Sequence, residues 1–212
     1  MSDDRLNEAE AALMSDDRLN EAEAALIRLA RGNEAYMSRD RSPVDLSPAR
    51  RAELAGAGQA PYAVIVTCSD SRVPPEHIFS VGLGELFVVR TAGNVVGDFE
   101  RGSIEFAVQQ LGAPLVVVMG HSQCGAVSAA LAGSAEGYLD TVVREIQEGL
   151  DGTTNAEEAA RKNIQQSIRR IRESAIVGQL VAADQLMVTG AEYDLQTGQV
   201  KFLPDPEDCI FA

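Results

Sequence analysis

Residues that bind transition metals follow two apolar runs of this sequence. Cys68 comes directly after the run Tyr62–Thr67, and His121 and Cys124 follow the run Leu115–Met119. Zinc takes thiolate and imidazole ligands, and three protein ligands are typical of a catalytic site, because a fourth position then remains for water. A lone buried cysteine is usually only a small apolar side chain. Three such residues at two strand ends, however, predict a zinc site.

A carboxylate and a guanidinium follow Cys68 within four residues. Asp70 and Arg72 lie two residues apart, so the guanidinium can hold the carboxylate. Alone, this spacing is typical of a structural ion pair or a turn. Beside a metal, Arg72 would keep Asp70 ionised and oriented, so that Asp70 accepts a hydrogen bond from metal-bound water or ligates the metal itself.

The elements that must position these residues follow from the apolar pattern. The runs Tyr62–Thr67, Leu86–Val89 and Leu115–Met119 lack strict alternation, which indicates strands buried on both faces of a parallel sheet. In such sheets, ligand sites form beyond the carboxyl ends of the strands.

Helices and late strands complete the predicted domain. Apolar residues at i, i+3, i+4 and i+7 predict a helix over Ser103–Leu111, and a second helix presents Ile164, Ile168 and Ile171 on one face. Late strands are expected at Leu186–Tyr193 and Gln199–Leu203, joined by a turn around Thr197-Gly198. This order predicts an α/β fold with a central, largely parallel sheet flanked by helices and preceded by an N-terminal helical arm.

The first 26 residues are an exact tandem repeat, since MSDDRLNEAEAAL occurs at 1–13 and again at 14–26. Two copies are too few for a repeat architecture. The spacing of leucine and alanine predicts a helix with one apolar stripe. We therefore expect a helical arm over 1–37 and a catalytic domain over 38–212. The arm is either a solvated helix or a segment that binds or exchanges with a partner.

Composition excludes several classes of function. The net charge of -14 argues against nucleic acid binding, which requires clustered basic residues. No apolar run is long enough to cross a bilayer, and the first residues lack the basic and apolar pattern of a secretory leader, so we expect none. Three cysteines, an odd number, indicate reduced thiols rather than a disulfide framework, so we expect a cytoplasmic protein.

Taken together, these segments resemble the beta-class carbonic anhydrases. The resemblance covers approximately residues 28–204 in the expected order. Cys68-Ser69-Asp70-Ser71-Arg72-Val73-Pro74 resembles the first zinc-binding motif of that family, and Gly120-His121-Ser122-Gln123-Cys124-Gly125 resembles the second. The strand and loop between the two motifs, and a late strand, are also similar, at Gly84–Asn94 and Gly190–Asp194.

This resemblance implies a function and a set of site residues. It implies reversible hydration of carbon dioxide to bicarbonate and a proton by a zinc-bound hydroxide. Cys68, His121 and Cys124 would hold the zinc ion, and Asp70 and Arg72 would form an orienting dyad. In many members of the family, the residue that matches Asp70 becomes a fourth ligand at lower pH. The family also implies a homodimer or a dimer of dimers.

The residues leave other hypotheses open. The same scaffold could hydrolyse carbonyl sulfide or carbon disulfide. A thiol or redox protein could use Cys68 or Cys124 as its nucleophile. A binding module could hold zinc structurally, with Asp70 closing the site. For the carbonic anhydrase hypothesis, two thiolates cancel the charge of zinc, which predicts activity that rises into alkaline pH.

Overall fold

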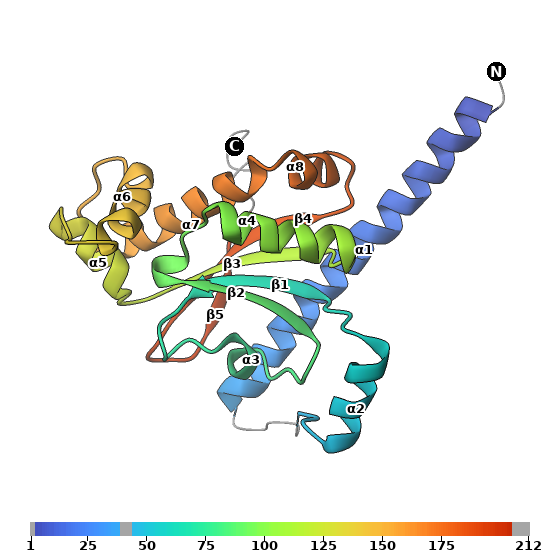
Figure 1. Ribbon diagram of the computed structural model, residues 1–212, viewed down its shortest axis with the longest axis horizontal. Coiled ribbons are helices and arrows are strands. Elements are labelled where there is room, and N and C mark those ends of the chain that lie inside the picture. Colours follow the sequence, from blue (N-terminus) through green and yellow to red (C-terminus); the bar gives the residue numbers. More distant parts are fainter. Residues whose placement is uncertain (1–2, 39–43, 205–212) are drawn as a thin grey trace.

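The centre of the protein is a sheet of five strands. The computed structural model describes residues 3–38 and 44–204. The strands are β1 (Ala63–Cys68), β2 (Leu86–Thr91), β3 (Leu115–His121), β4 (Met187–Tyr193) and β5 (Val200–Phe202). Their order is β2-β1-β3-β4-β5, as Figure 1 shows. All neighbouring pairs are parallel except β4–β5, which confirms the predicted largely parallel sheet.

Helices cover both faces of the sheet. One face carries α4 (Asp98–Glu105), α7 (Ala156–Arg172) and α8 (Ala175–Ala182). The other face carries α1 (Asp3–Ser38) and α3 (Pro75–Ile78). Beyond the carboxyl end of β3 lie α5 (Gly125–Ala132) and α6 (Leu139–Gly149), which contact α7, and α2 (Pro48–Ala57) precedes β1. Within the described ranges, no helix combines the length and the apolar character needed to cross a membrane.

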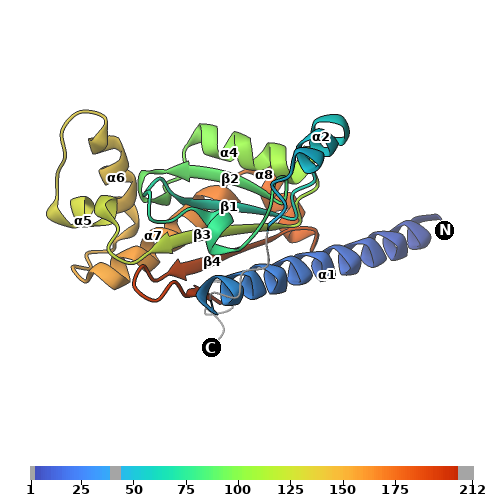
Figure 2. The same cartoon turned by 90° about the horizontal axis from the view of Figure 1, so that it is seen from below.

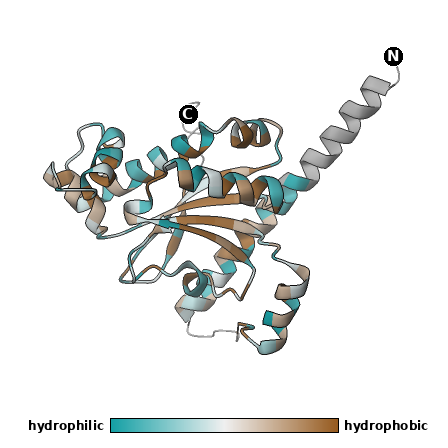
Figure 3. Ribbon diagram, in the orientation of Figure 1, coloured by the Kyte–Doolittle hydropathy of each residue, from teal (hydrophilic) through white to brown (hydrophobic). Residues whose placement is uncertain are grey.

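The two central strands that lead to the predicted metal-binding residues are buried along their whole length. Every residue of β1 and of β3 is buried. Val64 and Val66 pack towards α7, whereas Ile65 packs towards α1. Figure 3 shows these strands as apolar segments between helices with polar outer faces. Burial on both faces fixes the strands, and therefore also the residues at their carboxyl ends.

The second half of α1 lies along one face of the sheet, as Figure 2 shows. Ala22, Ala25 and Leu29 are buried there and form a stripe. Arg18 extends the contact, because its Nη1 donates to the carbonyl oxygen of Gly112 at 3.1 Å. The division into an arm over 1–37 and a domain over 38–212 stays a prediction.

Asn33 fastens α1 to two other elements. This side chain is 3% exposed. Its Nδ2 donates to the carbonyl oxygens of Ile78, at 3.2 Å, and of Gly198, at 2.9 Å. Its Oδ1 accepts a hydrogen bond from the backbone N–H of Val200 at 2.8 Å. One buried amide thus joins α1 to α3 and to the β4–β5 hairpin.

One helix differs from the prediction. The helix expected over Ser103–Leu111 begins earlier, at Asp98, and its last turn, Phe106–Gln110, has the wider π form. Its start is fixed by a contact that the apolar pattern does not encode, since Glu100 accepts a hydrogen bond from the backbone N–H of Gly97 at 2.9 Å. The inward face of α7 is as predicted, with Ile164, Ile168 and Ile171 buried.

Candidate metal centre

The sheet brings together the three predicted metal-binding residues. Cys68 ends β1 and His121 ends β3, and these strands are parallel neighbours in the sheet. Cys124 precedes the first turn of α5, where it has extended backbone angles. The ligand atoms of the three residues all lie within 4.8 Å of one another, and all three residues are buried. The three residues can therefore hold a metal ion between them.

The two thiols are close enough to affect each other's ionisation. Their Sγ atoms lie 4.0 Å apart. The pKa of Cys68 is lowered, mainly because Cys124 donates a hydrogen bond to its sulfur; the backbone N–H groups of Gly93 and Asp70 also donate to it, at 3.2 and 3.4 Å. The pKa of Cys124 is raised, mainly because it is the donor in that pair and also because it is buried. The pair alone therefore favours one negative charge, and a bound dication would favour two.

One ring nitrogen of His121 contacts a backbone carbonyl oxygen, and the other has no hydrogen-bond partner among the described residues. Its Nδ1 lies 2.9 Å from the carbonyl oxygen of Ser122, which can only accept, so Nδ1 carries the proton in this contact. Its Nε2 is buried without a hydrogen-bond partner in the described part of the chain. A buried polar atom without a partner is rare in folded proteins. Two sulfurs and this free nitrogen form the donor set that a borderline-soft divalent cation prefers, so the residues fit a metal ion.

Asp70 and Arg72 form a two-pronged ion pair beside the cluster. Arg72 Nε donates to Asp70 Oδ1 at 2.9 Å, and Nη2 donates to Oδ2 at 2.7 Å. These bonds hold the pKa of Asp70 well below its usual range. Asp70 Oδ2 also lies 3.9 Å from His121 Nε2. The structure thus places an ionised carboxylate at the border of the three candidate metal-binding residues.

Arg90, on β2, fixes the backbone that carries Asp70. Its Nε donates to the carbonyl oxygen of Cys68 at 2.9 Å, and its Nη2 donates to the carbonyl oxygen of Asp70 at 2.6 Å. Two charge-assisted bonds to carbonyl oxygens that are two residues apart restrict this part of the backbone strongly. The orientation of Asp70 is therefore set both by Arg72, from the same loop, and by a neighbouring strand.

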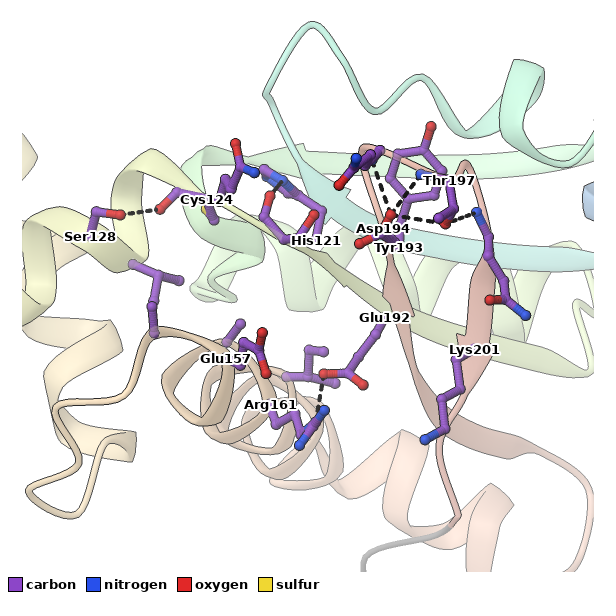
Figure 4. A pocket seen from close by; sticks show the side chains of 18 residues that line it. His121, Cys124, Ser128, Glu157, Arg161, Glu192, Tyr193, Asp194, Thr197 and Lys201 are labelled. Atoms are coloured by element: carbon purple, nitrogen blue, oxygen red, sulfur yellow. Dashed lines mark hydrogen bonds and ion pairs between the residues drawn. The ribbon is translucent and has the colours of Figure 1, made fainter. Parts of the chain in front are cut away.

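A cavity of about 830 Å³ borders His121 and Cys124. Figure 4 shows Glu157 and Arg161 entering it from α7, and Glu192 and Lys201 entering it from the β4–β5 hairpin. Arg161 Nε donates to Glu192 Oε1 at 2.7 Å, so these two charges compensate each other. Other parts of the wall are apolar and come from Val127, Ala160 and Ile164. A small molecule thus has room beside two of the three candidate metal-binding residues.

Comparison with known proteins decides the family. A sequence model of the family described as carbonic anhydrase matches residues 63–200. One of two tetrameric beta-carbonic anhydrases from the ascomycete Sordaria macrospora is 32% identical, with a TM-score of 0.65 over 74% of this chain and 87% of that chain. The chain belongs to the beta-class carbonic anhydrase family.

Further relatives agree with membership of the carbonic anhydrases. Carbonic anhydrase 2 of Mycobacterium tuberculosis is 41% identical over 160 residues, which are 70% of this chain and 77% of that protein. A beta-carbonic anhydrase from Coccomyxa, solved in complex with acetazolamide, is 30% identical, with a TM-score of 0.60 over 76% of this chain and 87% of that one. Membership makes this protein a carbonic anhydrase enzyme, as its motifs predict.

Several residues near the cluster had no role in the sequence analysis. Gly93 lies in the segment Gly84–Asn94, which resembles the family, but its hydrogen bond to the Cys68 sulfur joins residues 25 positions apart and so is visible only in the folded structure. Asn163 and Ser167, on α7, contact the loop of Gly93 although they are far from it in sequence. Only the burial of polar residues among isoleucines could have indicated them, and that burial is not visible without the sheet.

Proposed function

We propose that this carbonic anhydrase hydrates carbon dioxide reversibly to bicarbonate and a proton, with a zinc ion held by Cys68, His121 and Cys124. The observation that carries the proposal is the buried set of two sulfurs and one unpartnered imidazole nitrogen, within 4.8 Å of one another. When bound there, zinc would act as a Lewis acid that lowers the pKa of water and so supplies a nucleophile near neutral pH. The relatives support the reaction, and the donor set supports the metal.

The other residues of the site would orient the reactants. Asp70, kept ionised by Arg72, would accept a hydrogen bond from the attacking water and so direct its lone pair towards the carbon of the substrate. Carbon dioxide is apolar, and the walls formed by Val127, Ala160 and Ile164 offer an apolar surface beside His121. Arg72 would also restrain Asp70 from leaving its position.

We assign a second role to Asp70 in a resting state. An oxygen of this carboxylate lies 3.9 Å from His121 Nε2, so a small rotation away from Arg72 would bring it to the metal as a fourth ligand. That arrangement would exclude water and stop the reaction. The bidentate bond to Arg72 opposes it and favours the active arrangement.

We also propose a homo-oligomer, a dimer or a dimer of dimers, in the cytoplasm. The Sordaria macrospora relative is one of two tetrameric beta-carbonic anhydrases of that fungus. Among the described residues, the edge strand β2 pairs on one side only, and Phe99 on the adjacent α4 is 90% exposed, so a second copy could cover both. A reducing compartment would keep the Cys68 and Cys124 thiols available to the metal. Light scattering on the purified protein should give a mass at least twice that of one chain.

The deciding experiment combines zinc content with stopped-flow hydration of carbon dioxide at pH 7 and pH 8.5. We expect one zinc per chain and a faster reaction at pH 8.5. Asp70→Ala should retain zinc and lose at least about 100-fold in rate, because the orienting carboxylate is gone. Asp140→Ala is the matched control, since it breaks an aspartate–arginine pair on α6 outside the site and should leave the rate unchanged. Zinc without hydration at either pH would refute the reaction, and protein without zinc would refute the metal centre.

A further inference from the structure

The loop after β2 places a backbone donor on the Cys68 sulfur. Gly93 has φ 68° and ψ 23°, in the left-handed region, and its N–H lies 3.2 Å from Cys68 Sγ. A Cβ at this position would lie 2.9 Å from Ala126 Cβ and 2.9 Å from Ile146 Cδ1. Both the backbone conformation and the space therefore require glycine. Asn94, the next residue, is also left-handed, with φ 49°.

Two polar side chains of α7 hold this loop in place. Asn163 Nδ2 donates to the carbonyl oxygen of Gly93 at 2.7 Å. Ser167 Oγ donates to the carbonyl oxygen of Asn94 at 2.8 Å, and Asn94 Nδ2 donates back to Ser167 Oγ at 3.4 Å. Asn163 is 1% exposed and Ser167 is 2% exposed, so water does not compete for these bonds.

Stability alone accounts poorly for Asn163. Within the described residues its Oδ1 is buried without a hydrogen-bond partner, and such an acceptor lowers stability. The other buried residues of α7 include four apolar ones and two polar ones, namely Ala159, Ile164, Ile168 and Ile171, and Gln166 and Ser167. The hydrogen bond that Asn163 does form is to the carbonyl oxygen of Gly93, and the N–H of Gly93 contacts the sulfur of Cys68.

We propose that Asn163, assisted by Ser167, is a positioning residue that fixes the Gly93 N–H on the Cys68 sulfur and thereby sets how strongly that sulfur binds the metal. The inference rests on the proposed metal centre. Hydrogen bonds to a ligand atom orient it and reduce its negative charge, and loss of such partners typically weakens metal binding by about 10- to 100-fold. α7 thus acts on the metal through the backbone of another segment.

The test compares three variants of the full-length protein. Asn163→Leu removes the bond to Gly93 and keeps the branched shape of the side chain, and Ser167→Ala removes only the two bonds with Asn94. Thr189→Val is the matched control, because it also removes one hydrogen bond of a buried side chain. That bond runs from Thr189 Oγ1 to the carbonyl oxygen of Leu203 and does not involve the loop of Gly93. Zinc affinity is measured by competition with a chromogenic chelator. The thiolate-to-metal charge-transfer bands are recorded in the near ultraviolet after cobalt(II) substitution.

We expect Asn163→Leu to bind zinc about 10- to 100-fold more weakly and Ser167→Ala to lose less, while Thr189→Val stays within about twofold. The cobalt charge-transfer bands of Asn163→Leu should move to longer wavelength, because a sulfur that loses a donor is more electron-rich; a purely structural role would not move them. Unchanged affinity and bands in both α7 variants would overturn the inference alone. Wild type that binds no zinc would refute the metal centre as well. If Asn163→Leu does not fold, the milder Ser167→Ala decides the result by the same two readouts.

Discussion

Replacing Asn33 by alanine should be among the most destabilising single changes on α1. The substitution removes three buried hydrogen bonds, to Ile78, Gly198 and Val200. A typical bond of this kind contributes about 1 kcal/mol net, so the free energy of unfolding should fall by about 3 kcal/mol. The loss is expected because two carbonyl oxygens and one N–H remain behind without their partner.

Equilibrium urea unfolding, followed by circular dichroism at one fixed protein concentration, measures this difference. The fixed concentration matters because the apparent stability of an oligomer depends on it. Glu34→Ala is the matched control, since this neighbour on α1 is exposed and should change stability by no more than about 0.5 kcal/mol. If Asn33→Ala costs less than about 1 kcal/mol more than Glu34→Ala, the three bonds contribute little and the reasoning is wrong.

Three further predictions concern the arm, the cavity wall and the sheet. Deleting residues 1–13 should leave the calorimetric melting temperature unchanged, because the identical second copy at 14–26 keeps Arg18, Ala22 and Ala25 and their contacts; a fall of more than about 4 °C would contradict this. The pKa of Asp194 is lowered in the folded protein, mainly because the backbone N–H of Thr197 donates a hydrogen bond to its carboxylate. The charged carboxylate therefore stabilises the fold at pH values above the unfolded-state pKa of about 3.9. This contribution is lost as the pH falls through the lower pKa of the folded state. The stability gap to Asp194→Asn in urea unfolding should therefore be constant between about pH 7 and 5 and shrink below about pH 4, and a gap that persists there would count against the assignment. Gly120→Ala should cost about 1–3 kcal/mol in the same assay, since its Cβ would lie 2.8 Å from Ile164, whereas Gly56→Ala has open space and should not destabilise.

The location of the site could be predicted from sequence because strand ends are easy to recognise. The apolar runs before Cys68 and His121 are long and rich in valine, and parallel strands must bring their carboxyl ends to one edge of the sheet. The same argument places Cys124, three residues beyond His121, at the start of the following helix. These three positions depend on local pattern and on a general rule of topology, and the structure brings them together.

The supporting contacts could not be predicted in the same way. Asn163 is a polar residue in a helix rich in charged residues, and nothing in its neighbours in the sequence separates it from a solvated position. Its burial and its bond to Gly93 follow from how α7 crosses β3 and the loop after β2. The early start of α4 is another such case, because the bond from Gly97 to Glu100 outweighs the apolar pattern. Such features need the tertiary structure, which pattern does not supply.

The separation of the proposed metal-binding residues along the chain has a consequence for folding kinetics. Cys68 and Cys124 are 56 positions apart, and they come together only when β1 pairs with β3. The chain between these two strands contains β2 and α4. Closing a loop of this length costs entropy before any bond compensates for it, so the complete ligand set forms only after the long-range strand pairing. Metal added to refolding protein should therefore slow unfolding much more than it speeds folding, because the transition state precedes the finished site. The ion would stabilise a fold that has already formed rather than nucleate its formation.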